Sequence, residues 1–84
     1  MTLTLLSRSY CHLCDEMREA LLPIAERYGA VVAEFDVDAD SSLEAPFGER
    51  VPVVLLGGVE DGIELCHFRI DRAHIEAILA GNRA

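Results

Sequence analysis

The sequence predicts an α/β domain with a four-stranded mixed sheet flanked by helices, in the order βαβ, then α, then ββα. Two observations favour this fold class. A long helical pattern separates the first two short apolar runs, which should therefore form a parallel pair joined by a right-handed crossover. A glycine-rich turn, GGVEDG, separates the last two apolar runs, which should form a hairpin. The length of 84 residues predicts a single domain spanning residues 1–84.

The first half of the chain is expected to be a strand, a helix and a strand. Thr2–Leu6 is apolar and predicts the first strand, and Ala30–Asp36 predicts the second. Between them, apolar residues recur at helical spacing and form one stripe: Leu13, Met17, Ala20, Leu21, Ile24 and Tyr28. Gly29 fits the position just past the helix end, and Pro23 should kink the helix.

The second half begins with a short helix. Ser41 followed by Glu44 matches a capping box at its start, and Pro46 should keep the helix short or irregular before it ends near Gly48. Leu43 and Phe47 are its expected buried residues.

A hairpin and a last helix should follow. Val51–Leu56 predicts the third strand and Ile63–Phe68 the fourth. Asp71 can cap the final helix, which should end before Gly81. Its predicted buried face is Ile75, Ile78 and Leu79.

The composition limits the possible partners. Fifteen acidic residues against seven basic ones give a formal net charge of −8, so neither nucleic acid nor an anionic membrane is an expected partner. No apolar run approaches the ~20 residues that span a bilayer. The N-terminal stretch MTLTLLSRSY lacks the basic region of a signal peptide, so we expect a cytoplasmic protein. Thiols stay reduced there, which makes a Cys-x-x-Cys motif catalytic or metal-binding rather than a structural staple.

Cys11 and Cys14 form such a motif, CHLC, at the predicted helix start. Unpaired N–H groups and the helix dipole favour an anion at this end, so the pKa of the Cys11 thiol should fall. Residues three apart in a helix have Cα atoms roughly 5 Å apart, within the range of a disulfide. Cys11 would attack a disulfide, and Cys14, one turn further in and less exposed, would resolve the mixed disulfide.

Local charges act on this thiol in both directions. Arg8 and a protonated His12 would stabilise a Cys11 thiolate, whereas Asp15 and Glu16 would oppose it. The expected change in the pKa is therefore a moderate depression.

Two other interpretations of the motif compete with a working dithiol. Both cysteines could pack in the core as small apolar residues, but Cys14 fits the inner side of the predicted stripe poorly and Cys11 lies at the helix mouth. Zinc would need four ligands. The candidates are Cys11, His12, Cys14, Cys66, His67 and His74. They offer no second paired spacing, and adjacent Cys66 and His67 point to opposite faces of a strand, so no metal site is predicted and Cys66 is expected to pack in or near the core.

The order of these motifs resembles the thioredoxin fold, and the chain is most similar to small bacterial glutaredoxin-like proteins of uncertain function. The resemblance rests on the Cys11–Cys14 motif, on Arg8 shortly before it, and on the dipeptide Val51-Pro52 that opens the third strand. It implies a cis proline beside the cysteines, whose bend exposes the main chain of Val51 to an extended substrate. The implied site is catalytic Cys11 and Cys14, with substrate-binding residues Arg8, Tyr10, His12, Val51 and Pro52.

The sequence also departs from that family. His12-Leu13 stands where glutaredoxins usually have Pro-Tyr, so the role of the family's middle residues does not carry over. The glycine pair Gly57-Gly58 lies before the fourth strand, whereas glutathione-using members have one after it. Glutathione is therefore only a weakly supported co-substrate, and no resident cofactor is predicted.

These observations together predict a glutaredoxin-like disulfide reductase. Its partner would be a disulfide-containing protein or a low-molecular-weight thiol, and the chain is expected to be a monomer. Two alternatives remain open at this point. One is a non-catalytic thioredoxin-fold binding module, and the other is an iron–sulfur carrier in which Cys11 thiolates of two chains bridge a cluster.

Overall fold

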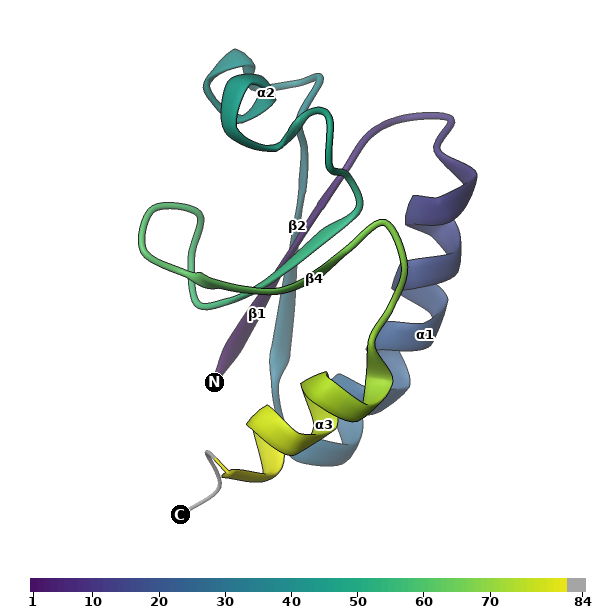
Figure 1. Ribbon diagram of the computed structural model, residues 1–84, viewed down its shortest axis with the longest axis vertical. Helices are drawn as coiled ribbons and strands as arrows, with labels where there is room; N and C mark the ends of the chain where they lie inside the picture. The colour runs from purple at the N-terminus through teal and green to yellow at the C-terminus, as the bar shows by residue number, and fades with distance from the viewer. Residues whose placement is uncertain (82–84) are drawn as a thin grey trace.

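The computed structural model describes residues 1–81 and has the predicted α/β architecture (Figure 1). The strands are β1 (Thr2–Ser7), β2 (Val31–Asp36), β3 (Val53–Leu56) and β4 (Ile63–His67), and the helices are α1 (His12–Tyr28), α2 (Ser41–Phe47) and α3 (Arg72–Gly81). The sheet order is β2-β1-β3-β4. β1 pairs parallel with β2 and antiparallel with β3, and β4 pairs antiparallel with β3, so the mixed four-stranded sheet is confirmed.

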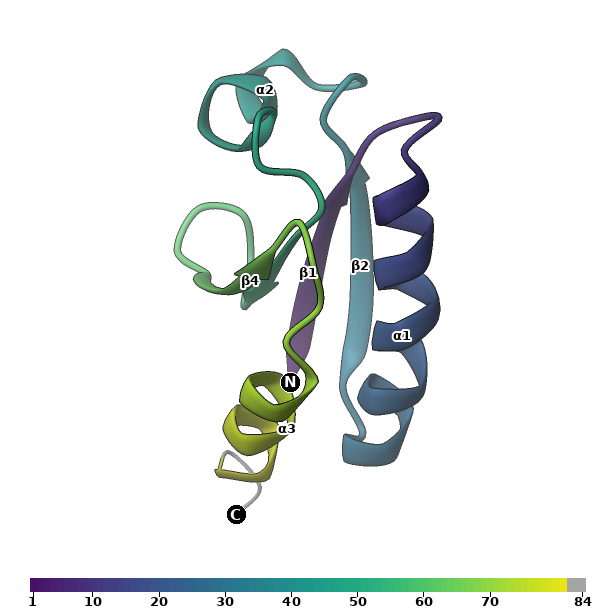
Figure 2. The ribbon, with the colours of Figure 1, turned by 45° about the vertical axis from the view of Figure 1, so that its right-hand side comes forward.

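The sheet carries helices on both faces. One core cluster joins Leu3 and Leu5 of β1 to Leu21 of α1 and Leu79 of α3. A second cluster on the opposite face joins Leu6, Val53 and Leu55 to Leu43 of α2. Figure 2 shows the resulting layers, with α1 along one side of the sheet and α2 above the other.

β1 is paired on both edges because it lies between β2 and β3, and the two core clusters cover its two faces. Leu3, Leu5 and Leu6 are inaccessible to solvent, and so is nearly all of Thr4 and Ser7. The buried hydroxyl of Thr4 donates a hydrogen bond of 2.6 Å to the carbonyl of Gly57, which satisfies the one polar side chain in the middle of the strand. The end of β1 is thereby held rigidly in the centre of the domain.

The buried face of α1 differs from the predicted stripe at its N-terminal end. It consists of Cys14, Met17, Leu21, Ile24 and Ala25. Leu13, the first predicted member, is partly exposed instead, since the face turns toward Cys14 at this end. The helix continues unbroken through Pro23, and Gly29 ends it as predicted, in the left-handed conformation at φ 70°.

Several predicted boundaries change. Three strand ends move by one residue: β1 extends to Ser7, β2 begins at Val31 and β4 ends at His67. The cap of α2 is Asp40 rather than Ser41, because the Asp40 carboxylate accepts the Ser42 N–H at 3.0 Å. β3 begins at Val53 rather than Val51, since Pro52 has no N–H to join the ladder. Asp71 caps α3 as predicted, accepting the His74 N–H at 3.1 Å, but the helix includes Gly81 instead of ending before it.

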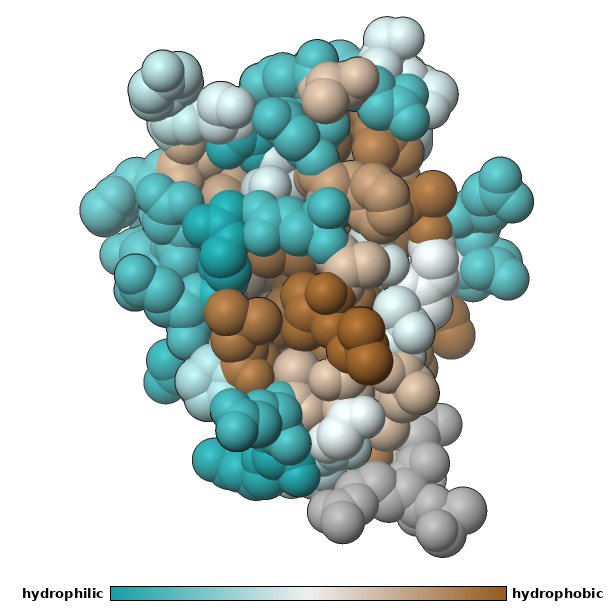
Figure 3. Space-filling view, turned by 180° about the vertical axis from the view of Figure 1, so that it is seen from behind, coloured by the Kyte–Doolittle hydropathy of each residue, from teal (hydrophilic) through white to brown (hydrophobic). Residues whose placement is uncertain are grey.

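The outer part of β2 remains uncovered. Val31 and Phe35 are exposed on this edge strand. Seen from behind Figure 1, apolar residues gather in the middle of the surface and hydrophilic residues surround them (Figure 3). Along residues 1–81, no helix has the length and apolar character that crossing a bilayer requires.

Adjacent leucines of α1 test the burial pattern directly. Leu21 is inaccessible, whereas Leu22 is 48% exposed. We expect Leu21→Ala to lower the free energy of unfolding by about 2–5 kcal/mol, because it removes core contacts and leaves a cavity. Leu22→Ala is the matched control and should change it by less than about 1 kcal/mol. Urea unfolding of the oxidised proteins measures both, and equal losses would contradict this packing of α1.

Candidate functional site

The two cysteines lie at the start of α1, just after the central strand β1 ends. After β1 ends at Ser7, a short connection leads to Cys11, which is the N-cap of α1. The Cys11 sulfur accepts the main-chain N–H of Cys14 at 3.1 Å, so it takes the place of the oxygen that usually caps a helix. The two residues form a disulfide, with their Cα atoms 5.2 Å apart, close to the separation expected from helix geometry.

The cysteines differ sharply in accessibility. Cys11 is partly exposed, while Cys14 is 0% exposed. The expectation that Cys14 would fit the inner side of the helix poorly is wrong, because the buried face of α1 begins at this residue. A reagent in solution can therefore reach Cys11 but not Cys14.

Arg8 extends toward α2. One of its guanidinium nitrogens lies 2.5 Å from a carboxylate oxygen of Glu44 and 3.6 Å from one of Asp38. Its positive charge is thus shared with two carboxylates. Glu44, predicted as part of a capping box, serves here as the partner of Arg8 and ties α2 to the loop that precedes Cys11.

Tyr10 and His12 flank Cys11 at the surface. Tyr10 is fully exposed and adopts a positive φ of 57°, and the His12 side chain is 88% exposed. The His12 Nε2 lies 3.7 Å from Glu16 on the next turn. Both rings can contact a molecule that approaches Cys11, and neither is held in place by packing.

Val51 and Pro52 lie just before β3, at the same end of the sheet as the C-terminal end of β1. Leu6 pairs with Val53, which places Pro52 opposite Ser7. The Val51–Pro52 peptide bond is cis, as expected from the resemblance, and Pro52 is buried. Within residues 1–81 the main-chain N–H and C=O of Val51 make no hydrogen bond. They remain available to an added extended strand.

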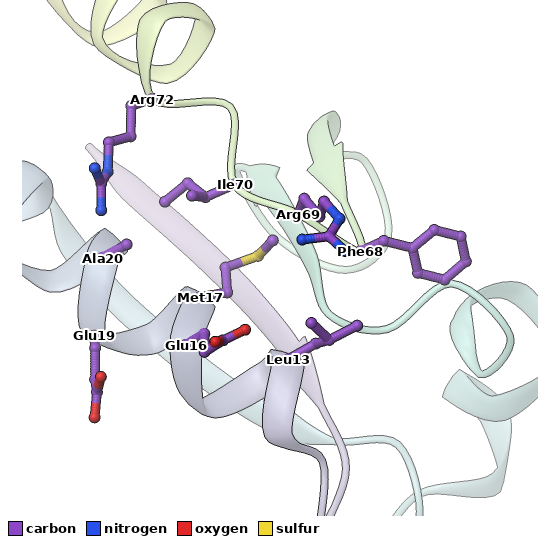
Figure 4. Close-up of a pocket in the computed structure, with 9 residues that line it drawn as sticks. All are labelled: Leu13, Glu16, Met17, Glu19, Ala20, Phe68, Arg69, Ile70 and Arg72. Atoms are coloured by element: carbon purple, nitrogen blue, oxygen red, sulfur yellow. The ribbon is translucent and has the colours of Figure 1, made fainter.

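A second wall of the site was not predicted from the sequence. A groove of about 440 Å³ separates the first turns of α1 from the connection between β4 and α3 (Figure 4). It begins at Leu13, between the two cysteines, and its far wall is formed by Phe68, Arg69, Ile70 and Arg72. The Phe68 N–H donates to the Pro52 carbonyl at 2.9 Å, which links this wall to the cis proline. The available signal was FRIDR, which places two arginines close together in an acidic chain.

Cys66 is separate from the disulfide. It lies half-buried on β4 and packs against the core, as predicted. Burial raises the pKa of its thiol, although a hydrogen bond from the main chain of Asp71 acts in the opposite direction. Across residues 1–81, no three His, Cys, Asp or Glu side chains come together in a geometry that could hold a metal ion.

Similarity to known proteins agrees with this architecture. The Mycobacterium tuberculosis protein Rv0508, described as uncharacterized, is 35% identical over 81 residues, covering 90% of this chain and 79% of that protein. The solution structure of Ne2328 from Nitrosomonas europaea superposes with a TM-score of 0.75 at 30% identity, over 92% of this chain and 88% of the other. The X-ray structure of XcR50 from X. campestris gives 0.69 at 38% identity, over 94% and 96%.

A more distant match concerns the fold alone. A mutant thioredoxin from Halobacterium salinarum has a TM-score of 0.75 at 22% identity, over 99% of this chain and 74% of that one. The thioredoxin-like fold and the bonded cysteine pair together fit a redox role. The model of the glutaredoxin-like domain (DUF836) matches residues 2–80, and the chain therefore belongs to this glutaredoxin-like family.

Proposed function

We propose that this protein is a thiol–disulfide oxidoreductase that reduces disulfides through Cys11 and Cys14. The observation that carries the proposal is the asymmetric disulfide at the start of α1, with the partly exposed Cys11 at the N-cap and Cys14 buried behind it. A thiolate at Cys11 would receive the Cys14 N–H bond and the favourable end of the helix dipole. We expect these interactions to favour the thiolate of reduced Cys11 and so to make it the attacking group.

The reaction moves two electrons in two exchange steps. The Cys11 thiolate attacks one sulfur of a substrate disulfide, and the other substrate sulfur leaves as a thiolate that takes a proton from water. The Cys14 thiol then loses its proton to solvent and attacks Cys11 in the mixed disulfide. This step releases the second substrate thiolate and closes the Cys11–Cys14 bond. The substrate gains two electrons and the protein dithiol loses them.

The free main chain of Val51 supports a substrate bound as an extended segment. Such a segment would pair with the exposed N–H and C=O beside Pro52 and bring its disulfide to Cys11. Tyr10 and His12 would contact it at the rim. Arg8 would act mainly through its bonds to Asp38 and Glu44, which hold the loop before Cys11 in place.

The proposed substrates are protein disulfides or low-molecular-weight disulfides such as that of glutathione. We further propose that the protein works as a monomer in the cytoplasm, where a reducing thiol pool could regenerate the dithiol. No resident cofactor is needed for this exchange.

Cysteine variants test the assignment of roles. Starting from reduced protein and a disulfide-bridged peptide, Cys11→Ser should abolish peptide reduction, because the accessible nucleophile is gone. Cys14→Ser should accumulate a mixed disulfide on Cys11, since no group resolves it. Intact-mass spectrometry and release of peptide thiol measure both effects.

Cys66→Ser is the control for these variants, because Cys66 lies outside the disulfide. It should reduce the peptide at the wild-type rate. Undiminished reduction by Cys11→Ser would refute the mechanism. A wild-type protein that reduces neither peptide nor glutathione disulfide would instead match a binding module.

Thiol reactivity against pH tests the predicted order of pKa values. Only the thiolate reacts with iodoacetamide, so a thiol with a raised pKa reacts fast only at higher pH. Burial raises the pKa of Cys66, whereas the helix start should lower that of Cys11. In reduced protein at pH 7 we expect Cys11 to be alkylated at least about tenfold faster, which corresponds to one pKa unit.

Peptide mapping by mass spectrometry follows both thiols in one sample, so each serves as the reference for the other. The midpoint of the rate profile should lie at lower pH for Cys11. Coincident midpoints would contradict the activation of Cys11 by the helix start.

A further inference from the structure

The groove beside α1 continues away from the disulfide and is large enough for part of a polypeptide. Its α1 wall runs from Leu13 to Ala20, an axial length of roughly 10 Å at ~1.5 Å per residue. An extended chain covers this length with about three residues at ~3.3 Å each. Met17 and Ile70 make its floor apolar. A substrate whose disulfide lies at Cys11 could therefore place its neighbouring residues along this groove.

Most of the arginines described in the structure have a carboxylate partner, and two do not. Within residues 1–81, four arginines form ion pairs: Arg8, Arg18, Arg27 and Arg50. Arg69 and Arg72 form no ion pair with any residue of that range, and both line the groove. In a chain with fifteen acidic residues, a guanidinium without a carboxylate partner is the exception.

The side chains are directed so that the two cations face the groove. In Figure 4 Arg72 reaches from the start of α3 toward Ala20, and the Arg69 guanidinium turns toward Met17. On the α1 wall, Glu19 points away from the arginines, and Glu16 lies 3.7 Å from His12. An anionic group that enters the groove would meet two guanidinium groups that have no ion-pair partner within residues 1–81, each able to bind a carboxylate with two hydrogen bonds. The carboxylates of Glu16 and Glu19 also line the groove and act against such a ligand.

We propose that the groove binds an acidic segment next to the disulfide of a protein substrate, with Arg69 and Arg72 contacting its carboxylates. This inference rests on the proposed exchange reaction and names its substrate class. Asp or Glu would lie within about three residues of the substrate cysteine, as the groove length requires. The remaining surface is strongly acidic, so these two arginines also supply the selectivity for such a segment, since an acidic protein lacking them would repel it.

Three disulfide-bridged peptides of equal length test the proposal. They carry Asp, Asn or Lys within three residues of one cysteine, and each is mixed with the reduced wild-type protein in a single turnover. We expect the Asp peptide to react roughly three to ten times faster than the Asn peptide at low salt, and the Lys peptide to show no such gain. The advantage should shrink as salt screens the contact.

Variants assign the effect to the groove. Arg69→Gln/Arg72→Gln should bring the ratio of Asp-peptide to Asn-peptide rates close to one. Glu16→Gln/Glu19→Gln removes negative charge from the opposite wall and should maintain or increase this ratio. Arg27→Gln is the matched control, because Arg27 pairs with Glu76 outside the groove, and it should leave the ratio unchanged.

The outcomes separate this inference from the proposed function. Equal rates for the three peptides, a preference for Lys, or a preference that survives Arg69→Gln/Arg72→Gln would overturn the acidic-segment site while leaving disulfide exchange intact. A dependence on the arginines seen only with glutathione disulfide would also overturn it, in favour of a small anionic thiol. Failure to reduce any disulfide would refute the exchange reaction itself.

Discussion

Complete burial of β1 beyond its first residue is the constraint on which the rest of the structure depends. This strand pairs on both edges and packs on both faces, so each of its buried side chains has a fixed environment. Leu3 and Leu5 hold α1 and α3, while Leu6 holds the α2 side. Because the strand cannot shift without exposing several leucines, its C-terminal end is a rigid support for the reactive loop. β3 runs antiparallel to β1, so it begins at the end of the sheet where β1 finishes, and this brings Pro52 opposite Ser7.

Rigid support matters because one atom has two roles. The Cys11 sulfur caps α1 and is also the atom that would attack a disulfide. To cap α1, the sulfur must lie at the N-terminal end of the helix. The same position favours an anion there, which is what a reactive thiolate needs. Cys14 sits one turn later on the buried face, so the dithiol can close without moving the helix. In the proposed reaction, local helix geometry would therefore supply both the activation and the order of the two thiols.

The sequence was sufficient to predict the element order, the parallel β1–β2 pair, the β3–β4 hairpin and the bonded cysteines, because each depends on local patterns. The antiparallel pairing of β1 with β3, which joins the two halves, is a long-range contact and was not predicted. Gly29 ends a helix through its own backbone freedom, and the GGVEDG turn forces a hairpin. The prediction was wrong at two positions where either of two neighbouring residues could take the same structural role. Asp40 rather than Ser41 caps α2, and the buried face of α1 passes through Cys14 rather than Leu13. The cap depends on which residue keeps an extended backbone at the helix start, and the buried face depends on how the helix is rotated against the sheet. Periodicity alone determines neither.

The charges of the site show a different limit of sequence reasoning. Arg8, three residues before Cys11, is near it in the chain, yet its bonds go to Asp38 and Glu44. Arg69 and Arg72 are far away in sequence, yet they face the groove that begins at Leu13 between the cysteines. What a charge can do depends on whether folding has already given it a partner. Within residues 1–81, four of the six arginines have a carboxylate partner. Arg69 and Arg72, rather than the arginine nearest to Cys11 in sequence, are therefore the cations that we propose for substrate binding.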